Sequence, residues 1–161
     1  MTNLVVLVKI TLAPDFNLLY PTVVRFSIKV QYGLQALLEL ALAYGGGPVQ
    51  IKEIAKSQKL PIRYLEQLLL ILKRGGLVVS QRGKEGGYLL KKHPSDIPLL
   101  ELVEYLDGKI ELVSKNMKKT PVLFSTFQVV QDKIKAGLAE VSLEDLVIRK
   151  RQRERSYVYN I

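Results

Sequence analysis

Positive charge is concentrated between Val49 and His93. This segment holds ten basic and three acidic residues, so it carries +7 of the +9 formal net charge of the 161-residue chain. Its basic residues are Lys52, Lys56, Lys59, Arg63, Lys73, Arg74, Arg82, Lys84, Lys91 and Lys92. Cations gathered on one module suit the neutralisation of phosphates, which makes nucleic acid the leading candidate partner. The alternative is a solvated basic face on a small helical domain.

Two helices are predicted to position the first of these cations. Residues 51–59 form a short helix that ends at Leu60, because a residue before a proline is disfavoured in the helical region. A second helix runs from Pro61 to Arg74 and is closed by the two glycines that follow it. Its apolar positions fall at the spacing of one buried face: Leu65, Leu68, Leu69 and Leu72.

A β-hairpin is predicted directly after the second helix. Residues 77–81 and 87–91 are short apolar runs on either side of a glycine-containing turn at 82–86. Helix, turn, helix and hairpin in this order predict a winged helix-turn-helix, so the fold class is mainly α with a small β-hairpin wing. In that fold the second helix enters a major groove and the hairpin lies along the backbone beside it.

Four further helices are predicted outside this segment. They cover residues 28–44, 98–107, 121–139 and 143–149, with Ser27, Ser95 or Asp96, Thr120 and Ser142 as their respective caps. The helix at 121–139 has a broad apolar face at the end of a small domain, so it needs a partner surface, most commonly a second copy of the chain. We interpret the charged run KRQRER at 150–155 as a frayed, solvated end in preference to a second DNA contact.

The first 24 residues differ from the rest of the chain. Their apolar run is broken by Lys9, Pro14 and Pro21, and it lacks the charged start and cleavage site of a signal peptide. Three interpretations are open: a strand-like extension, a disordered segment, or residues that are not native because translation starts near Val23 or Val24. We favour the last, because VRFSIK offers a plausible domain start.

The composition excludes several other functions. The chain contains no cysteine, which excludes disulfides, thiolate metal sites and a cysteine nucleophile. Its one histidine, His93, is interpreted as a loop residue, since a zinc site usually needs three or four ligands. No apolar run approaches the ~18–20 residues of a membrane span. There is also no phosphate loop or nucleophile–base pair, so we do not expect an enzyme.

The sequence resembles a known family of bacterial winged-helix regulators, typified by the iron–sulfur cluster regulator and the cysteine-metabolism regulator. The matching stretches are RFSIKVQYGLQALLELA, GPVQIKEIAKSQKLPIRYLEQLLLILKRGGLVVSQRGKEGGYLL and HPSDIPLLELVEYLDG, and the string YLEQLL…GLV…RG…GGY is the most specific part. A weaker likeness continues through FSTFQVVQDKIKAGLAEVSLEDLV, so the resemblance spans Arg25 to about Ile148. It implies a DNA-binding domain at 25–108, a loop at 109–119 and a dimerisation region at 120–149, and it leaves out the extension at 1–24 and the basic tail at 150–161.

The resemblance also implies a function and its site. A family member is expected to be a cytoplasmic homodimer that binds double-stranded DNA at palindromic or half-palindromic promoter sites and regulates transcription, most often as a repressor. Tyr64, Glu66 and Gln67 lie where the family reads bases, although Tyr64 has packing as an alternative role. Ser27 and Lys29 match positions that hold phosphates, and Arg82 suits the minor groove or the backbone. The full set of expected DNA-binding residues is Arg25, Ser27, Lys29, Arg63, Tyr64, Glu66, Gln67, Arg82 and Lys84.

Departures from the family pattern concern the input signal. Iron–sulfur members carry three cysteines in the loop that is GKIELVSKNMKKTP here, and this loop contains none. Because thiolates are the usual cluster ligands, no cluster of the family's kind and no other cofactor is expected. Gln31 stands where an arginine is common, and Phe124 or Phe127 stands in place of a tryptophan. The signal is left open between a small molecule, a protein partner and the protein's own concentration.

The main competing hypothesis is a winged helix that serves protein assembly without sequence-specific DNA binding. Such a module has no need to present Gln67, Arg82 and Lys84 on one basic surface, and on that ground we prefer the DNA-binding regulator.

Overall fold

A computed structural model describes residues 26–158 of the chain. The expectations for residues 1–25 and 159–161 therefore lie outside the described residues. In chain order the elements are α1 (Ile28–Leu42), α2 (Ile51–Gln58), α3 (Ile62–Arg74), β1 (Val78–Gln81), β2 (Gly87–Leu90), α4 (Leu99–Asp107), α5 (Pro121–Ala139) and α6 (Leu143–Val158). Short 3-10 helices occupy Pro94–Asp96 and Lys115–Lys119. Within this part of the chain, no helix has the length and apolarity to cross a membrane.

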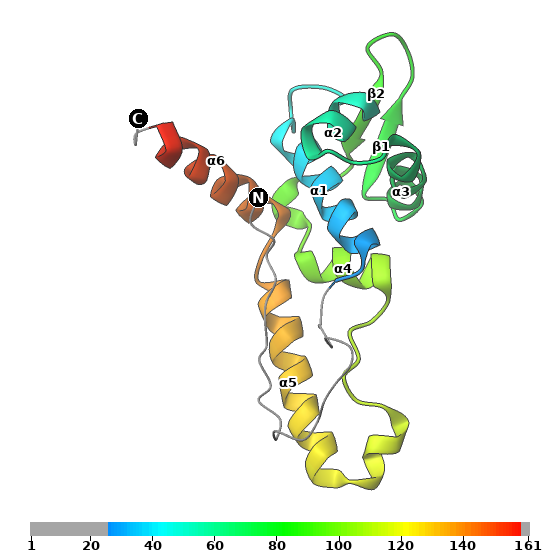
Figure 1. The fold of residues 1–161 in the computed structure, drawn as a ribbon, viewed down its shortest axis with the longest axis vertical. Helices are drawn as coiled ribbons and strands as arrows, with labels where there is room; N and C mark the ends of the chain where they lie inside the picture. The colour runs from blue at the N-terminus through cyan, green and yellow to red at the C-terminus, as the bar shows by residue number, and fades with distance from the viewer. Residues whose placement is uncertain (1–25, 159–161) are drawn as a thin grey trace, which may run out of the picture.

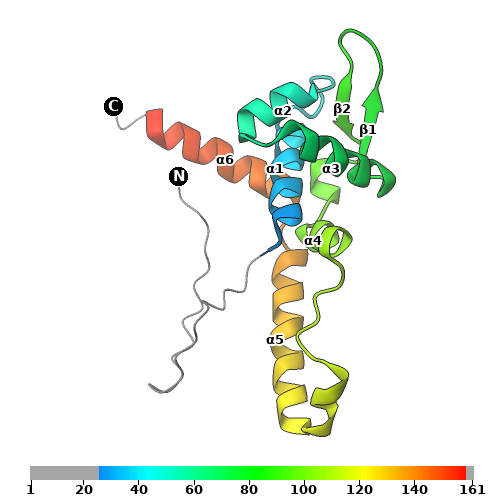
Figure 2. The ribbon, with the colours of Figure 1, turned by 45° about the vertical axis from the view of Figure 1, so that its right-hand side comes forward.

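The elements form a winged-helix body with two projecting helices. Helices α1 to α4 and the β1–β2 hairpin pack together, and the hairpin extends from the end of the body that is remote from α5 (Figure 1). Helix α5 projects from α4 as a stalk, and α6 returns to the body beside α1 before leaving it on the side away from the hairpin (Figure 2). The mainly helical fold with a small wing is confirmed.

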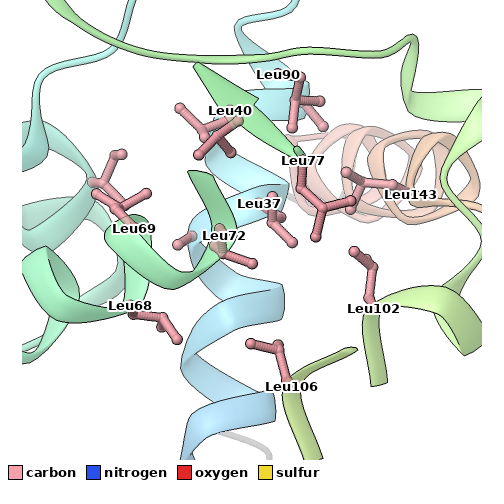
Figure 3. Close-up of a cluster of buried hydrophobic side chains, with 14 of the residues drawn as sticks. Leu37, Leu40, Leu68, Leu69, Leu72, Leu77, Leu90, Leu102, Leu106 and Leu143 are labelled. Atoms are coloured by element: carbon pink, nitrogen blue, oxygen red, sulfur yellow. The ribbon is translucent and has the colours of Figure 1, made fainter. Parts of the chain in front are cut away.

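The core is built from leucines that the helical periodicity had placed on buried faces. Leu68, Leu69 and Leu72 of α3 lie beside Leu37 and Leu40 of α1, and Leu77 and Leu90 close the core from the base of the hairpin (Figure 3). Leu65 of α3 belongs to the same buried cluster. Leu102 and Leu106 of α4 and Leu143 of α6 complete it. Each of these side chains is almost fully removed from water, so apolar burial fixes the orientation of α3 relative to α1 and the wing.

Several helix ends differ from expectation. Helix α6 continues to Val158, so the prediction that it would stop at residue 149 is wrong and the run at 150–155 is helical. Ser95 and Asp96 do not cap α4, because both lie in a 3-10 turn and Pro98 occupies the N-cap position. Thr120 precedes α5 without a side-chain capping bond. Elsewhere the caps are as predicted, with the Ser27 hydroxyl accepting from the Val30 amide at 3.2 Å.

The predicted cap at Ser142 fixes the start of α6. Its hydroxyl accepts from the Asp145 amide at 3.2 Å, while an Asp145 carboxylate oxygen accepts from the Ser142 amide at 2.8 Å and from its hydroxyl at 2.6 Å. These hydrogen bonds hold the pKa of Asp145 below its ordinary value, because they favour the charged form. The adjacent Leu143 is buried in the core, so the first turn of α6 belongs to the winged-helix body.

The wing is joined to the helix-turn-helix through the linker that precedes α2. Val49 and Tyr88 exchange two backbone hydrogen bonds of 2.9 Å, which adds a one-residue third strand to the hairpin. This approach is so close that a Cβ on Gly87 would collide with the carbonyl group of Val49. Glycine at position 87 is therefore required by packing, and the wing is held at a fixed angle to α2.

We expect Gly87→Ala to lower the free energy of unfolding by about 1–3 kcal/mol, because the new methyl group overpacks the contact with Val49. The matched control is Gly137→Ala in α5, where a Cβ meets no atom within 4 Å. This control should raise stability by about 0.5–1 kcal/mol, since alanine is the better helix former. Urea unfolding of both variants gives the comparison, and equal stability of Gly87→Ala and wild type would contradict the close approach.

Candidate nucleic-acid interface

The first two turns of α3 divide their side chains cleanly between core and solvent. Leu65 and Leu68 are buried, whereas Arg63, Glu66 and Gln67 are exposed. The polar side chains therefore project from the body as a group, held by the apolar face beneath them. Within residues 26–158, the Gln67 amide has no hydrogen-bond partner, so both its donor and its acceptor are available to a ligand.

Tyr64 differs from its neighbours on α3. Its ring is half-buried and packs edge-on against Tyr32 of α1, with 5.6 Å between ring centroids. It also contacts the margin of the hydrophobic core. This geometry supports the packing alternative for Tyr64 and leaves Arg63, Glu66 and Gln67 as the accessible group.

The wing presents its own exposed cations beside α3. Arg82 and Lys84 lie in the turn between β1 and β2 and are exposed. Gly83 between them has φ of 120°, a conformation that side chains rarely adopt, so glycine permits the tight turn that displays both cations. A shallow hollow lies between this turn and the start of α2, and Lys52 and Lys84 are among the residues that line it.

The cations on α2, α3 and the wing turn differ from those elsewhere because they take part in no ion pair within residues 26–158. Among residues 26–158, the basic residues in ion pairs are Lys29, Lys92, Lys135 and Lys150, and all of them lie outside α2, α3 and the hairpin. The cations on α2, α3 and the wing turn have no carboxylate partner in that part of the chain. They are Lys52, Lys56, Lys59, Arg63, Lys73, Arg74, Arg82 and Lys84, and we call this set the basic face. Its positive charge is thus left for an external anion.

Ser27 and Lys29 are turned toward a carboxylate of the same chain. The Ser27 hydroxyl donates to an Asp107 carboxylate oxygen at 2.6 Å, and the Lys29 ammonium group lies 3.9 Å from the same oxygen. Asp107 ends α4, far away in sequence, and this contact was not foreseen. Both residues are exposed or half-buried at the start of α1, and Arg25 lies outside the described residues.

Gln31, one turn further along α1, is also engaged within the chain. Its amide donates to the Phe26 carbonyl at 2.7 Å. The structure leaves Arg63, Glu66, Gln67, Arg82 and Lys84 exposed on α3 and in the wing turn, whereas the start of α1 forms a separate cluster around Asp107.

A second group of cations was missed as a structural feature. Arg149, Arg151, Arg153 and Arg155 lie on α6 and are exposed, on a helix that continues beyond the expected end. The signal was present in the sequence as the run KRQRER. We interpreted this run as a frayed end of the chain, and α6 indeed has few apolar residues beyond its first turns.

Comparison with known proteins places this arrangement in a family. Residues 26–149 match the family model Rrf2, which is described as an iron-dependent transcriptional regulator. The HTH-type transcriptional regulator CymR of Bacillus subtilis is 34% identical over 137 residues, which cover 85% of this chain and 99% of that protein. The regulator IscR of Photorhabdus laumondii is 33% identical over 129 residues, which cover 76% of this chain and 79% of that protein.

Solved structures give the same result. The structure of B. subtilis CymR, described as a global cysteine regulator, superimposes with a TM-score of 0.74 at 36% identity and covers 78% of this chain and 98% of that one. The IscR of T. potens gives a TM-score of 0.67 at 35% identity, with 79% and 88% covered. These neighbours share the winged-helix architecture described above.

The iron named in the family description has no fitting ligand set in this chain. The sequence contains no cysteine, and within residues 26–158 no three His, Asp or Glu side chains are placed to hold a metal ion. The family match nevertheless spans residues 26–149, which include α3 and the wing. The chain therefore belongs to the Rrf2 family and is a DNA-binding transcription regulator.

Proposed function

We propose that this protein is a homodimeric repressor that binds palindromic promoter DNA in the bacterial cytoplasm without an iron–sulfur cluster. The single observation that carries the proposal is the basic face, whose cations have no acidic partner in the described chain, together with the exposed Gln67 on α3. Such a surface offers phosphate contacts and a base-reading side chain together. An assembly module would need neither.

Each part of the surface has a distinct proposed role. Gln67 reads an adenine edge in the major groove, and Glu66 accepts from a cytosine amino group. Arg63 at the start of α3, with Arg82 and Lys84 in the wing, contacts phosphates or the minor groove and sets the register of the helix on DNA. Tyr64 supports α3 from below through Tyr32.

The proposed roles of Arg25, Ser27 and Lys29 rest on the family resemblance. For Ser27 and Lys29, Asp107 holds the two side chains together at the N-terminus of α1. A helix N-terminus with a nearby ammonium group is a suitable phosphate site. Asp107 would then orient these groups, at the cost of some of their positive potential.

The stalk supports the proposed homodimer. Leu123, Phe127, Val130 and Ile134 recur along one stripe of α5, and each is between 41% and 48% exposed. The side of α5 next to this stripe is already covered: Gln131 is buried and its side-chain oxygen accepts from the Leu112 amide at 2.8 Å, and Lys135 pairs with Glu104 at 3.4 Å. A second copy of α5 is the natural cover for the stripe, because it supplies an identical apolar surface.

Repression would then follow by occlusion. A dimer presents two copies of α3 to two half-sites of a palindrome, and bound protein blocks access to the promoter. Because this chain lacks thiolates, DNA binding does not require the assembly of a cluster on cysteines. DNA binding would then be regulated by another effector or by the concentration of the protein.

Lys84→Ala tests the wing part of the proposal. The variant should bind every DNA sequence more weakly and should lower the slope of log K against log salt by about one, because one phosphate contact is lost. Lys119→Ala at the far end of the stalk removes the same charge from an exposed site and is the matched control. Fluorescence anisotropy at several salt concentrations gives both slopes; an unchanged slope for Lys84→Ala would show that the wing does not touch phosphate.

A further inference from the structure

Helix α6 forms a basic arm beyond the winged-helix body. Its first turn is buried through Leu143, yet the helix continues to Val158 and leaves the body on the side opposite the wing (Figures 1 and 2). We use the name basic arm for the segment from Arg149 to Ser156, which extends about 12 Å as a helix. The arm carries four arginines and Lys150 against one acidic residue, Glu154.

The base of the arm is fixed to the helix-turn-helix by a polar network. The Lys150 ammonium group lies 3.2 Å from a carboxylate oxygen of Glu39, and the Gln58 amide donates to the same oxygen at 2.5 Å. Gln58 is the last residue of α2, directly before Lys59 and the turn into α3. The arm thus starts next to the end of α2, where the chain turns into α3. The ion pair between Lys150 and Glu39 is only partly exposed to solvent.

The remaining charges of the arm point away from the body. A helix turns about 100° per residue, so Lys150 and Glu154 share one face, the one that meets Glu39 on α1. By the same geometry Arg149 and Arg153 lie along one border of the outward side, and Arg151 and Arg155 along the other. All four guanidinium-bearing residues are exposed, and none is in an ion pair within residues 26–158.

We propose that the basic arm binds the phosphate backbone of DNA that flanks the site read by α3. The inference rests on the proposed DNA-binding role of the basic face, which it extends beyond α2 in the direction away from the wing. Arginine presents a planar fork of donors that matches phosphate, and a preformed helix loses little conformational entropy on binding. The partner is duplex DNA of any sequence, because phosphate contacts carry no base information.

The test compares Arg151→Gln/Arg155→Gln with Lys118→Gln/Lys119→Gln. Both double variants remove two positive charges; the first lies on the arm and the second at the far end of the stalk (Figures 1 and 2). Glutamine is a good helix former, so the arm should remain helical, and circular dichroism checks this. The probes are two duplexes: the short motif selected from genomic DNA by the wild-type protein, and the same motif with about ten base pairs of arbitrary sequence added at each end.

The arm variant should bind the long duplex roughly tenfold to a hundredfold more weakly than wild type at low salt, with a salt slope smaller by about two per protomer. On the short duplex it should equal wild type, and the stalk variant should equal wild type on both. Equal affinities and slopes for the arm variant on the long duplex would overturn the proposal, as would an equal loss on both duplexes. Failure of the wild-type protein to bind either duplex would instead count against the proposed function itself.

Discussion

Replacing Val130 and Ile134 with aspartate should convert the protein to a monomer and weaken its binding to a palindromic site by roughly 10²–10⁴-fold. Both side chains lie in the exposed apolar stripe of α5, with 42% and 41% of their surface accessible. Two carboxylates placed there would have to be desolvated at the dimer interface without a partner. Each half-site would then be bound separately, and the gain from linking two binding events would be lost.

Sedimentation velocity and fluorescence anisotropy on a palindromic duplex measure the two parts of this result. The matched control is Ser125→Asp/Ala136→Asp, because both positions are exposed on the other side of α5. The control should stay dimeric and bind like wild type. A stripe variant that remained dimeric with unchanged affinity would show that α5 is not the dimer contact.

Gln67→Ala should cost about 1–3 kcal/mol of binding free energy on the cognate site, or about fivefold to more than a hundredfold in affinity. The exposed amide can donate to and accept from one adenine edge, and alanine can do neither. Because Leu68 and Leu69 beneath it hold α3 in the core, the substitution should leave the fold intact. Binding to a set of duplexes that vary one base pair at a time should show relaxed preference at a single position.

Gln128→Ala on α5 is the matched control for this variant, since the same side chain is removed outside the helix-turn-helix. It should leave the base preference unchanged. An equal loss for Gln67→Ala on all sequences would mean that Gln67 contacts the backbone, and that α3 sits differently in the groove from the placement proposed here.

Local patterns were sufficient to predict the winged helix. The leucines of α3 repeat at the spacing of one helical face, and the glycines around the wing turn mark a hairpin, so the order of elements could be read along the chain. The exposed positions of Arg63, Glu66 and Gln67 follow from that same periodicity, because they fall between the buried leucines. The apolar face of α5 was likewise visible in the pattern, whereas the exposure of its stripe follows from the way α5 projects from the body.

Contacts between distant segments could not be predicted in this way. Asp107 meets Ser27 across 80 positions of sequence, and Lys150 meets Glu39 across 111. Neither pair has a local signature, since each depends on how α4 and α6 pack against α1. The length of α6 was missed because its distal turns have no apolar face, although arginine, glutamine and glutamate are all good helix formers.

This regulator combines exposed polar side chains on α3 and in the wing turn with a loop before α5 that contains no cysteine. The stalk and that loop are nevertheless joined, through Gln131 and Leu112, so the loop is still anchored where iron–sulfur members carry their cysteines. Under the proposed function, DNA binding in this fold would not depend on cluster chemistry. A signal that acts through the loop would have to change its contacts with α5.

We propose that this chain binds a specific DNA sequence without any added cofactor. The most direct measurement is the selection of bound fragments from the native genome by purified protein, at two salt concentrations and without added cofactor. We expect recovery of a short palindromic motif at both salt concentrations. Recovery of random fragments that disappear at the higher salt concentration, or of none at all, would contradict it.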